Sequence, residues 1–182
     1  MGYIHIMAYS GLNPLPNVSV HPDGYIVDAK GNVVKRAICP IPGDMSNRIF
    51  DGLIPGAVYE FRNGMRLEMC TVEQRLNFME ALAEFAHYTP VSEPGKMFQR
   101  PYTKGANAKK GGRYWELITL TTNRAIVGPV VSNKLAKEFT EDIKKAQDFD
   151  LKYGFEDGFY KQFLCWGEVF SVAADNGLVS IY

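Results

Sequence analysis

The chain lacks most of the residue patterns that mark metal-binding, redox and disulfide-stabilised proteins. Its 182 residues include three cysteines (Cys39, Cys70 and Cys165), which lie far apart, and three histidines without i,i+2 or i,i+4 spacing. An odd number of distant cysteines disfavours a disulfide framework, and the absence of Cys-x-x-Cys or of paired histidines disfavours a zinc or redox site. We therefore expect a reducing compartment, no metal and no cofactor.

Long apolar runs are also missing. No stretch approaches the roughly 20 apolar residues that span a bilayer, and residues 1–6 lack the basic region and apolar core of a signal peptide. The formal net charge is zero, so no overall field attracts nucleic acid or an anionic membrane surface. These absences predict no membrane association and no secretion by a signal peptide. We expect a location in the cytoplasm or in a particle formed there.

The motifs of common enzyme classes are absent as well. The sequence has no P-loop, no Gly-x-Gly-x-x-Gly and no Gly-x-Ser-x-Gly, and so offers no phosphate cradle, dinucleotide site or nucleophile elbow. A run that resembles a calcium loop begins at Asp148, but Lys152 stands at a ligand position, where it would repel the metal. We expect no catalytic residues. An enzyme with a dispersed site, using Cys70, His87 or Tyr102, stays open as an alternative.

The composition is that of a globular protein. Hydrophobic residues make up 46% of the chain and charged residues 22%, and the length suits one domain. Ten tyrosines and eleven phenylalanines give a large aromatic content, which is useful in a core and equally useful in an interface.

Three hairpins are predicted where β-type segments flank turn residues: 25–27 with 33–34, 58–62 with 65–69, and 115–120 with 125–131. Asn63-Gly64 is the strongest of these turn signals, because both residues tolerate positive φ. A three-residue loop there would pair Phe61 with Leu67 and Tyr59 with Met69, and so keep one face of the hairpin apolar.

Helices are predicted over 72–88 and 133–147 from apolar residues at helical spacing. Thr71 and Gln74 have capping-box spacing at the start of the first helix. Segment 158–173 is apolar nearly all round, which indicates a buried helix or part of a partner interface. Residues 178–182 are expected to form a strand. Together these elements predict an α+β fold with antiparallel hairpins and two to three helices.

The chain is expected to divide into an extended N-terminal arm, residues 1–22, and one α+β domain, residues 23–182. Residues 3–9 could form a short strand, but Pro14 and Pro16 interrupt any ladder or helix that would continue it. A tail laid over its own domain is the alternative interpretation of the arm.

A long basic loop is predicted over residues 89–113, inside the domain. Between Pro94 and Trp115 there are cations and no acid, whereas 138–157 is mainly acidic. Loops of this length often serve binding, so we expect its cations to face a partner or phosphate rather than fold back onto the domain. The alternatives are a solvated mobile loop and internal pairing with the acidic stretch. The candidate binding residues are Lys96, Arg100, Tyr102, Lys104, Lys109, Lys110 and Arg113.

Residues 51–61 (Asp-Gly-Leu-Ile-Pro-Gly-Ala-Val-Tyr-Glu-Phe) resemble the Gly-Leu-x-Pro-Gly-x-x-Tyr-x-Phe corner of fibronectin type III-like β-sandwiches. Residues 24–32 are similar to the start of related prealbumin-like modules. The resemblance covers at most residues 18–70 and concerns local geometry. It implies a sandwich-like N-terminal half in which the Tyr59 hydroxyl bonds the backbone of 51–56. The sandwich tryptophan is missing, and a helix is expected where another strand should follow.

The leading functional hypothesis is a non-enzymatic assembly subunit, such as a virion protein of a bacteriophage-like particle, that contacts other subunits of its own or another kind through the arm and the basic loop. An inhibitor or adaptor that binds a host protein or nucleic acid through the basic loop is the second hypothesis. Nucleic acid is the less favoured partner, because the net charge is zero.

Overall fold

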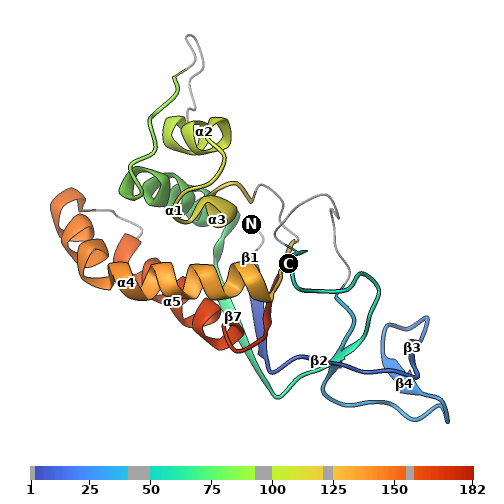
Figure 1. Ribbon diagram of the computed structural model, residues 1–182. Coiled ribbons are helices and arrows are strands. Elements are labelled where there is room, and N and C mark those ends of the chain that lie inside the picture. Colours follow the sequence, from blue (N-terminus) through green and yellow to red (C-terminus); the bar gives the residue numbers. More distant parts are fainter. Residues whose placement is uncertain (1–2, 41–49, 93–99, 121–124, 155–157) are drawn as a thin grey trace.

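The computed structural model describes residues 3–40, 50–92, 100–120, 125–154 and 158–182, and the statements below concern these residues. The fold is α+β, as predicted, with helices gathered on one face of an antiparallel sheet (Figure 1). The strands are β1 (Tyr3–Ser10), β2 (Asn13–Pro14), β3 (Val18–Val20), β4 (Ile26–Asp28), β5 (Ala37–Ile38), β6 (Tyr59–Glu60), β7 (Asn63–Thr71), β8 (Ala125–Val127) and β9 (Leu178–Ile181). The helices are α1 (Val72–Phe85), α2 (Pro101–Ala108), α3 (Trp115–Ile118), α4 (Pro129–Tyr153) and α5 (Phe159–Ala173).

The main sheet has four strands in the order β7-β1-β9-β8. Strand β1 lies inside it and pairs antiparallel with both β7 and β9. Its alternate residues Ile4, Ile6 and Ala8 are buried against the helical layer, as the period of a strand requires. The prediction that residues 1–22 form an arm is therefore wrong for this segment. Strand β1 ends at Ser10, before Gly11 with its positive φ of 63°, and Pro14 lies in the next short strand, β2.

Helix α5 is buried between the sheet and α4, which explains its apolar character on nearly all sides. Phe163, Trp166 and Phe170 are fully buried in the main core. The interpretation of 158–173 as a buried helix is confirmed. Although α4 is 25 residues long, none of the described helices is both long and apolar enough to cross a membrane.

The other predicted helices are also present. Helix α1 begins after Thr71, whose side chain accepts from the Gln74 N–H while the Gln74 side chain accepts from the Thr71 N–H, and the predicted capping box is confirmed. Helix α4 contains the predicted 133–147 helix but starts earlier. Pro129 occupies its first turn, where proline is well tolerated because that N–H has no intrahelical partner.

The hairpin predicted over 115–131 is wrong. Trp115–Ile118 form the short helix α3, and β8 pairs with β9 instead. Leu117 and Ile118 reach the main core from the helix. Their apolar character reflects burial and not a strand.

The hairpin predicted around Asn63-Gly64 is wrong too, although both of its arms are extended. Strand β7 pairs with β1, whereas β6 pairs with β2 and β5 in a three-stranded sheet. The chain changes sheet at Phe61, whose N–H donates to the Arg36 carbonyl. Phe61 packs edge-on against Tyr9 with ring centroids 4.7 Å apart. Tyr59 and Phe61 thus face a second, smaller apolar cluster on the outer face of the main sheet.

Strands β3 and β4 form a two-stranded ribbon that stands off from the helices, as Figure 1 shows at its lower right. The hairpin predicted from 25–27 and 33–34 is reduced to a single bridge, Val27 to Val33, because the main partner of β4 is β3. We call residues 13–38, which comprise β2 to β5, the β-lobe.

The predicted role of Tyr59 is confirmed. The Ile54 N–H donates to the Tyr59 hydroxyl oxygen at 2.7 Å, within the loop 51–56 that the β-sandwich corner implies. Tyr59 is buried in the second cluster. The hydroxyl therefore fixes the loop that leads into β6.

Replacing Tyr59 by Phe should lower the free energy of unfolding by roughly 0.5–1.5 kcal/mol, because the Ile54 N–H loses its acceptor. Urea unfolding followed by circular dichroism measures this. Tyr25→Phe is the control, since Tyr25 is 40% exposed. An equal effect of both changes would show that the bond to Ile54 stabilises nothing.

Candidate functional site

The described part of the predicted basic loop, residues 89–92 and 100–113, contains α2. Lys96 lies outside the described residues. Arg100 immediately precedes α2, Tyr102 and Lys104 lie within it, and Lys109 and Lys110 follow its end. Arg113 lies beyond two glycines, directly before Tyr114 and α3. The segment therefore places its cations along a helix and its C-terminal exit.

The N-terminus of α2 is occupied by a carboxylate of the same chain. Glu80 of α1 accepts hydrogen bonds from the Tyr102 N–H at 2.8 Å, the Thr103 N–H at 2.9 Å and the Thr103 hydroxyl at 2.7 Å. A helix N-terminus favours anions, and here Glu80 already takes that place. Glu84, next to the Tyr102 hydroxyl, raises the pKa of that tyrosine. This end of the segment is an acidic environment that disfavours phosphate.

Close backbone contacts hold α2 against α1 and α3. A Cβ on Gly105 would lie 1.9 Å from the Thr89 carbonyl oxygen, so only glycine fits there. The Trp115 indole N–H donates to the Ala106 carbonyl at 2.9 Å. Arg100 also donates to the Asn77 side chain at 3.2 Å. Internal contacts therefore order this part of the predicted loop.

Arg113 folds back onto the domain. Its Nη1 lies 3.0 Å from Glu141 Oε2, and its Nε lies 2.8 Å from Asp142 Oδ2. The prediction that the cations stay clear of the domain is wrong for this residue, and the alternative of pairing with the acidic stretch is correct. Within the described part of the chain, Lys109 and Lys110 are exposed and form no ion pair.

The acids that bind Arg113 belong to a buried polar cluster on α4. The Tyr114 hydroxyl lies 2.8 Å from the Glu138 carbonyl oxygen and 3.1 Å from Asp142 Oδ2, so its single proton can be donated to either acceptor. The Tyr114 N–H donates to Glu138 Oε2 at 2.7 Å. Asp142 is 3% exposed and also accepts from Lys145 at 2.7 Å. Burial raises the pKa of Glu138 and of Tyr114. The cluster satisfies its own charges.

A cleft of about 260 Å³ opens beside this cluster. His87, Arg113, Asp142 and Lys145 line it together with Phe85, Ala86, Tyr114 and Phe149. Asp142 already accepts from the Tyr114 hydroxyl and Lys145 and lies 2.8 Å from Arg113 Nε, so it is a poor general base. His87 lies here just after α1, whereas Cys70 and Tyr102 do not line the cleft. Of the three candidates for a dispersed enzyme site, His87 alone is thus among the residues that line this cleft. The described residues contain no cluster of metal-binding side chains.

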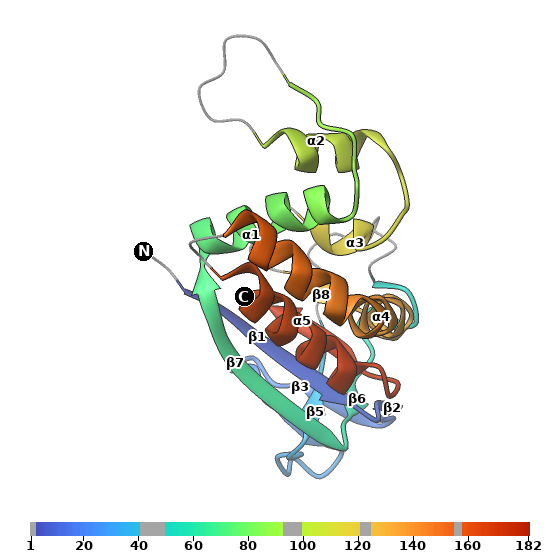
Figure 2. The same ribbon diagram turned by 90° about the vertical axis from the view of Figure 1, so that its left-hand side faces the viewer.

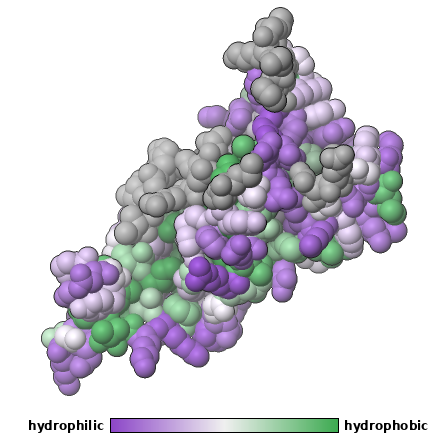
Figure 3. Space-filling view, turned by 180° about the vertical axis from the view of Figure 1, so that it is seen from behind, coloured by the Kyte–Doolittle hydropathy of each residue, from purple (hydrophilic) through white to green (hydrophobic). Residues whose placement is uncertain are grey.

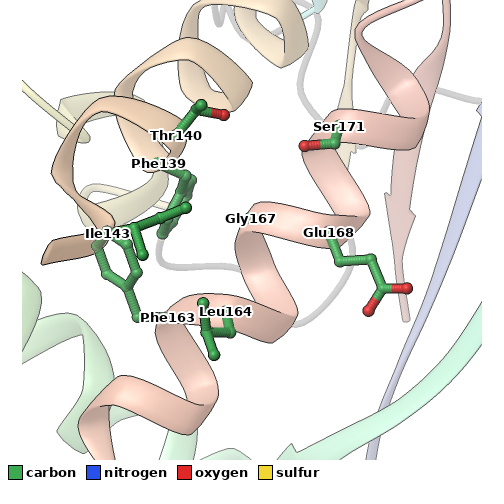
Figure 4. A pocket seen from close by; sticks show the side chains of 8 residues that line it. All are labelled: Phe139, Thr140, Ile143, Phe163, Leu164, Gly167, Glu168 and Ser171. Atoms are coloured by element: carbon green, nitrogen blue, oxygen red, sulfur yellow. The ribbon is translucent and has the colours of Figure 1, made fainter. Parts of the chain in front are cut away.

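An apolar groove of about 140 Å³ separates α4 from α5 (Figure 4). Phe139 and Ile143 of α4 face Phe163 and Leu164 of α5 across it, and Glu168 and Ser171 lie along its α5 side. Gly167 permits this approach, since a Cβ there would lie 3.3 Å from Phe139 Cβ. The lining offers apolar contact and no paired acid and base.

The β-lobe presents apolar side chains that the sequence prediction did not single out. Val20 is 45% exposed, Tyr25 40% and Val33 57%. A shallow groove of about 490 Å³ lies at the base of the lobe and is lined by Pro14, Leu15, Pro16, Val18, Gly56, Ala57 and Val58. Figure 3 shows hydrophobic surface on this side of the molecule. In the sequence, this segment shows only short β-type runs and many turn residues, a pattern that indicates a ribbon without a covering layer.

No protein-family model, curated protein or solved structure matches the chain.

Replacing Asp142 by Ala should lower the free energy of unfolding by about 2–3 kcal/mol, because it removes the buried carboxylate that faces Arg113 Nε and the Tyr114 hydroxyl. Asp148→Ala is the matched control on α4. Its pair with Lys144 is exposed, and its loss should cost no more than about 1 kcal/mol. Thermal unfolding of both variants compares them. Equal costs would mean that the cluster does not stabilise the fold.

Proposed function

We propose that this protein is a non-enzymatic assembly subunit that contacts neighbouring subunits through its β-lobe. The observation that carries the proposal is the projecting ribbon β3-β4 with Val20, Tyr25 and Val33 exposed. The sequence had suggested residues 1–22 as the segment that contacts neighbours, and the proposal now assigns that contact to residues 13–38. A bacteriophage-like virion is the proposed setting, to be tested by the composition of the native particle.

The physical argument starts from the small size of the ribbon. A two-stranded hairpin is marginally stable in water and normally needs a further layer on one face. Each strand here is three residues long. Covering Val20 and Val33 with a neighbouring subunit would bury apolar surface and restrict the ribbon at the same time. An aromatic side chain such as Tyr25 is typical of interface centres.

The double change Val20→Glu and Val33→Glu should reduce association without altering the unfolding midpoint, because both side chains are exposed in the isolated chain. Sedimentation velocity over a range of concentrations measures association. Val130→Glu is the matched control, since Val130 is 58% exposed against 57% for Val33. A wild-type protein that is monomeric at every concentration, with a protease-sensitive β-lobe, would contradict the proposal.

The second candidate function, an adaptor that binds an acidic partner, is favoured by one observation. Lys109 and Lys110 are adjacent and exposed at the end of α2, and form no ion pair with any residue that the structure describes. Arg100, Tyr102 and Arg113 have internal partners, which reduces the surface available for such binding.

Charge reversal of Lys109 and Lys110 should leave stability unchanged, because these side chains are exposed. If an acidic partner binds here, the reversal should weaken binding more at low salt than at high salt, since screening reduces the contribution of exposed charges. Affinity for an acidic polypeptide such as polyglutamate, measured at two ionic strengths, tests this. Binding that is unaffected by the reversal would remove the second candidate.

A further inference from the structure

Strand β7 is the outer edge of the main sheet that the described residues form. It is nine residues long and has β1 as its only sheet neighbour among the described strands. Figure 2 shows it along the margin of the sheet, with α5 on its inner side. A long edge strand exposes unpaired main-chain donors and acceptors.

The pairing of β1 determines which residues of β7 have a free backbone. His5 exchanges hydrogen bonds with Tyr182 on the β9 side, at 2.9 and 3.0 Å. Its neighbour Ile6 therefore faces β7, where its partner is Leu67. Alternation along the strand then directs the N–H and C=O of Arg66 and Glu68 away from the sheet. The main-chain groups of these two residues therefore form the unpaired edge of the sheet.

The side chains of the same two residues lie on the face of the sheet opposite the helices. Met65, Leu67 and Met69 pack against the main core, whereas Arg66 and Glu68 are exposed. Neither charge forms an ion pair within the described residues. An opposite charge directly across a strand pair stabilises it, and a like charge destabilises it.

We infer that β7 pairs with β7 of a second copy of this chain, antiparallel about a two-fold axis through Leu67. In this register Arg66 of each copy lies opposite Glu68 of the other, and each such pair exchanges two main-chain hydrogen bonds. Leu67 then meets Leu67 on the helical face. The two four-stranded sheets become one continuous sheet.

The charges select this register over its neighbours. A two-fold axis perpendicular to the sheet relates the two copies and passes between one residue of β7 and the same residue of the other copy. It leaves both helical layers on the same face of the joined sheet. Centred on Arg66 it would place two arginines opposite each other, and centred on Glu68 it would place two glutamates together. Only the centre at Leu67 gives two attractive pairs.

A bulge limits the length of the paired segment. The register of β7 against β1 shifts between Glu68 and Cys70, so that Met69 has no partner. Bulges twist an edge strand and terminate pairing. The contact is consequently short, and the dimer should dissociate on dilution. This inference extends the assembly proposal to a second surface and does not involve the β-lobe.

Charge exchange tests the register. Arg66→Glu and Glu68→Arg should each raise the dissociation constant of the dimer about tenfold, because each creates two repulsive pairs, and the double exchange should restore the wild-type value. Arg62→Glu is the control, because Arg62 precedes β7. Sedimentation equilibrium measures the constants, and circular dichroism verifies that each variant is folded.

Amide hydrogen exchange locates the contact independently. With rising protein concentration, the Arg66 and Glu68 amides should gain protection, while those of Met65 and Leu67, already bonded to β1, should not change. If neither Arg66→Glu nor Glu68→Arg changes the dissociation constant of the dimer, the β7 pairing is overturned and the assembly proposal is unaffected. If the charge exchanges at Arg66 and Glu68 change the dissociation constant but the Val20 and Val33 changes do not, the β7 pairing stands and the proposed β-lobe contact is overturned. A wild-type chain that stays monomeric would overturn both the β7 pairing and the assembly proposal. This holds even if β7 binds a strand of another protein, because the proposed partner is a second copy of this chain.

Discussion

The rest of the structure depends on the pairing of β1 on both of its edges. The two strands that pair with β1 are each continuous with a helix: β7 leads into α1 through the capping box at Thr71, and α5 leads into β9. Pairing with β1 therefore positions both helices. The turn before β9 approaches β1 so closely that a Cβ on Gly177 would lie 1.9 Å from the Tyr9 carbonyl oxygen. The inner face of β1 then supports the main core, and Tyr9 on its other face begins the second cluster. Both apolar clusters are thus organised around one strand.

The parts of the fold that local chemistry determines could be predicted from the sequence. Apolar residues at helical spacing located α1 and α4, and the nearly continuous apolar character of 158–173 indicated a buried helix or a partner interface at α5. The bond between Tyr59 and Ile54 followed from a short corner motif. Strand partners could not be predicted in this way, because they depend on segments far apart in the chain. Asn63-Gly64 favours a local hairpin, yet the backbone there continues into a strand that pairs with β1. Burial of Met65 and Leu67 against the main core outweighs the turn preference.

The candidate site shows the same division between local and distant information. The sequence located a basic segment but not the acids that meet it, since Glu80 precedes it on α1 and Asp142 follows it on α4. Exposed ion pairs are weak one at a time. Asp142, however, is buried, accepts from the Tyr114 hydroxyl and Lys145 and lies 2.8 Å from Arg113 Nε, so it fixes Arg113 in place. Charge counting along the chain cannot distinguish a solvated cation from one that is held in this way. The exposed residues of the β-lobe had no periodic pattern to identify them.

The position of β9 has a consequence for the biogenesis of the protein. Ile6 pairs with Ile181, so during translation β1 lacks one neighbour until almost all of the residues between them have been synthesised. Until then the nascent chain carries a hydrophobic strand with a vacant edge, which is a hazard for aggregation. Contacts between such distant residues also slow folding. A ribosome-associated chaperone that shields extended apolar segments would therefore be expected to raise the yield of folded protein.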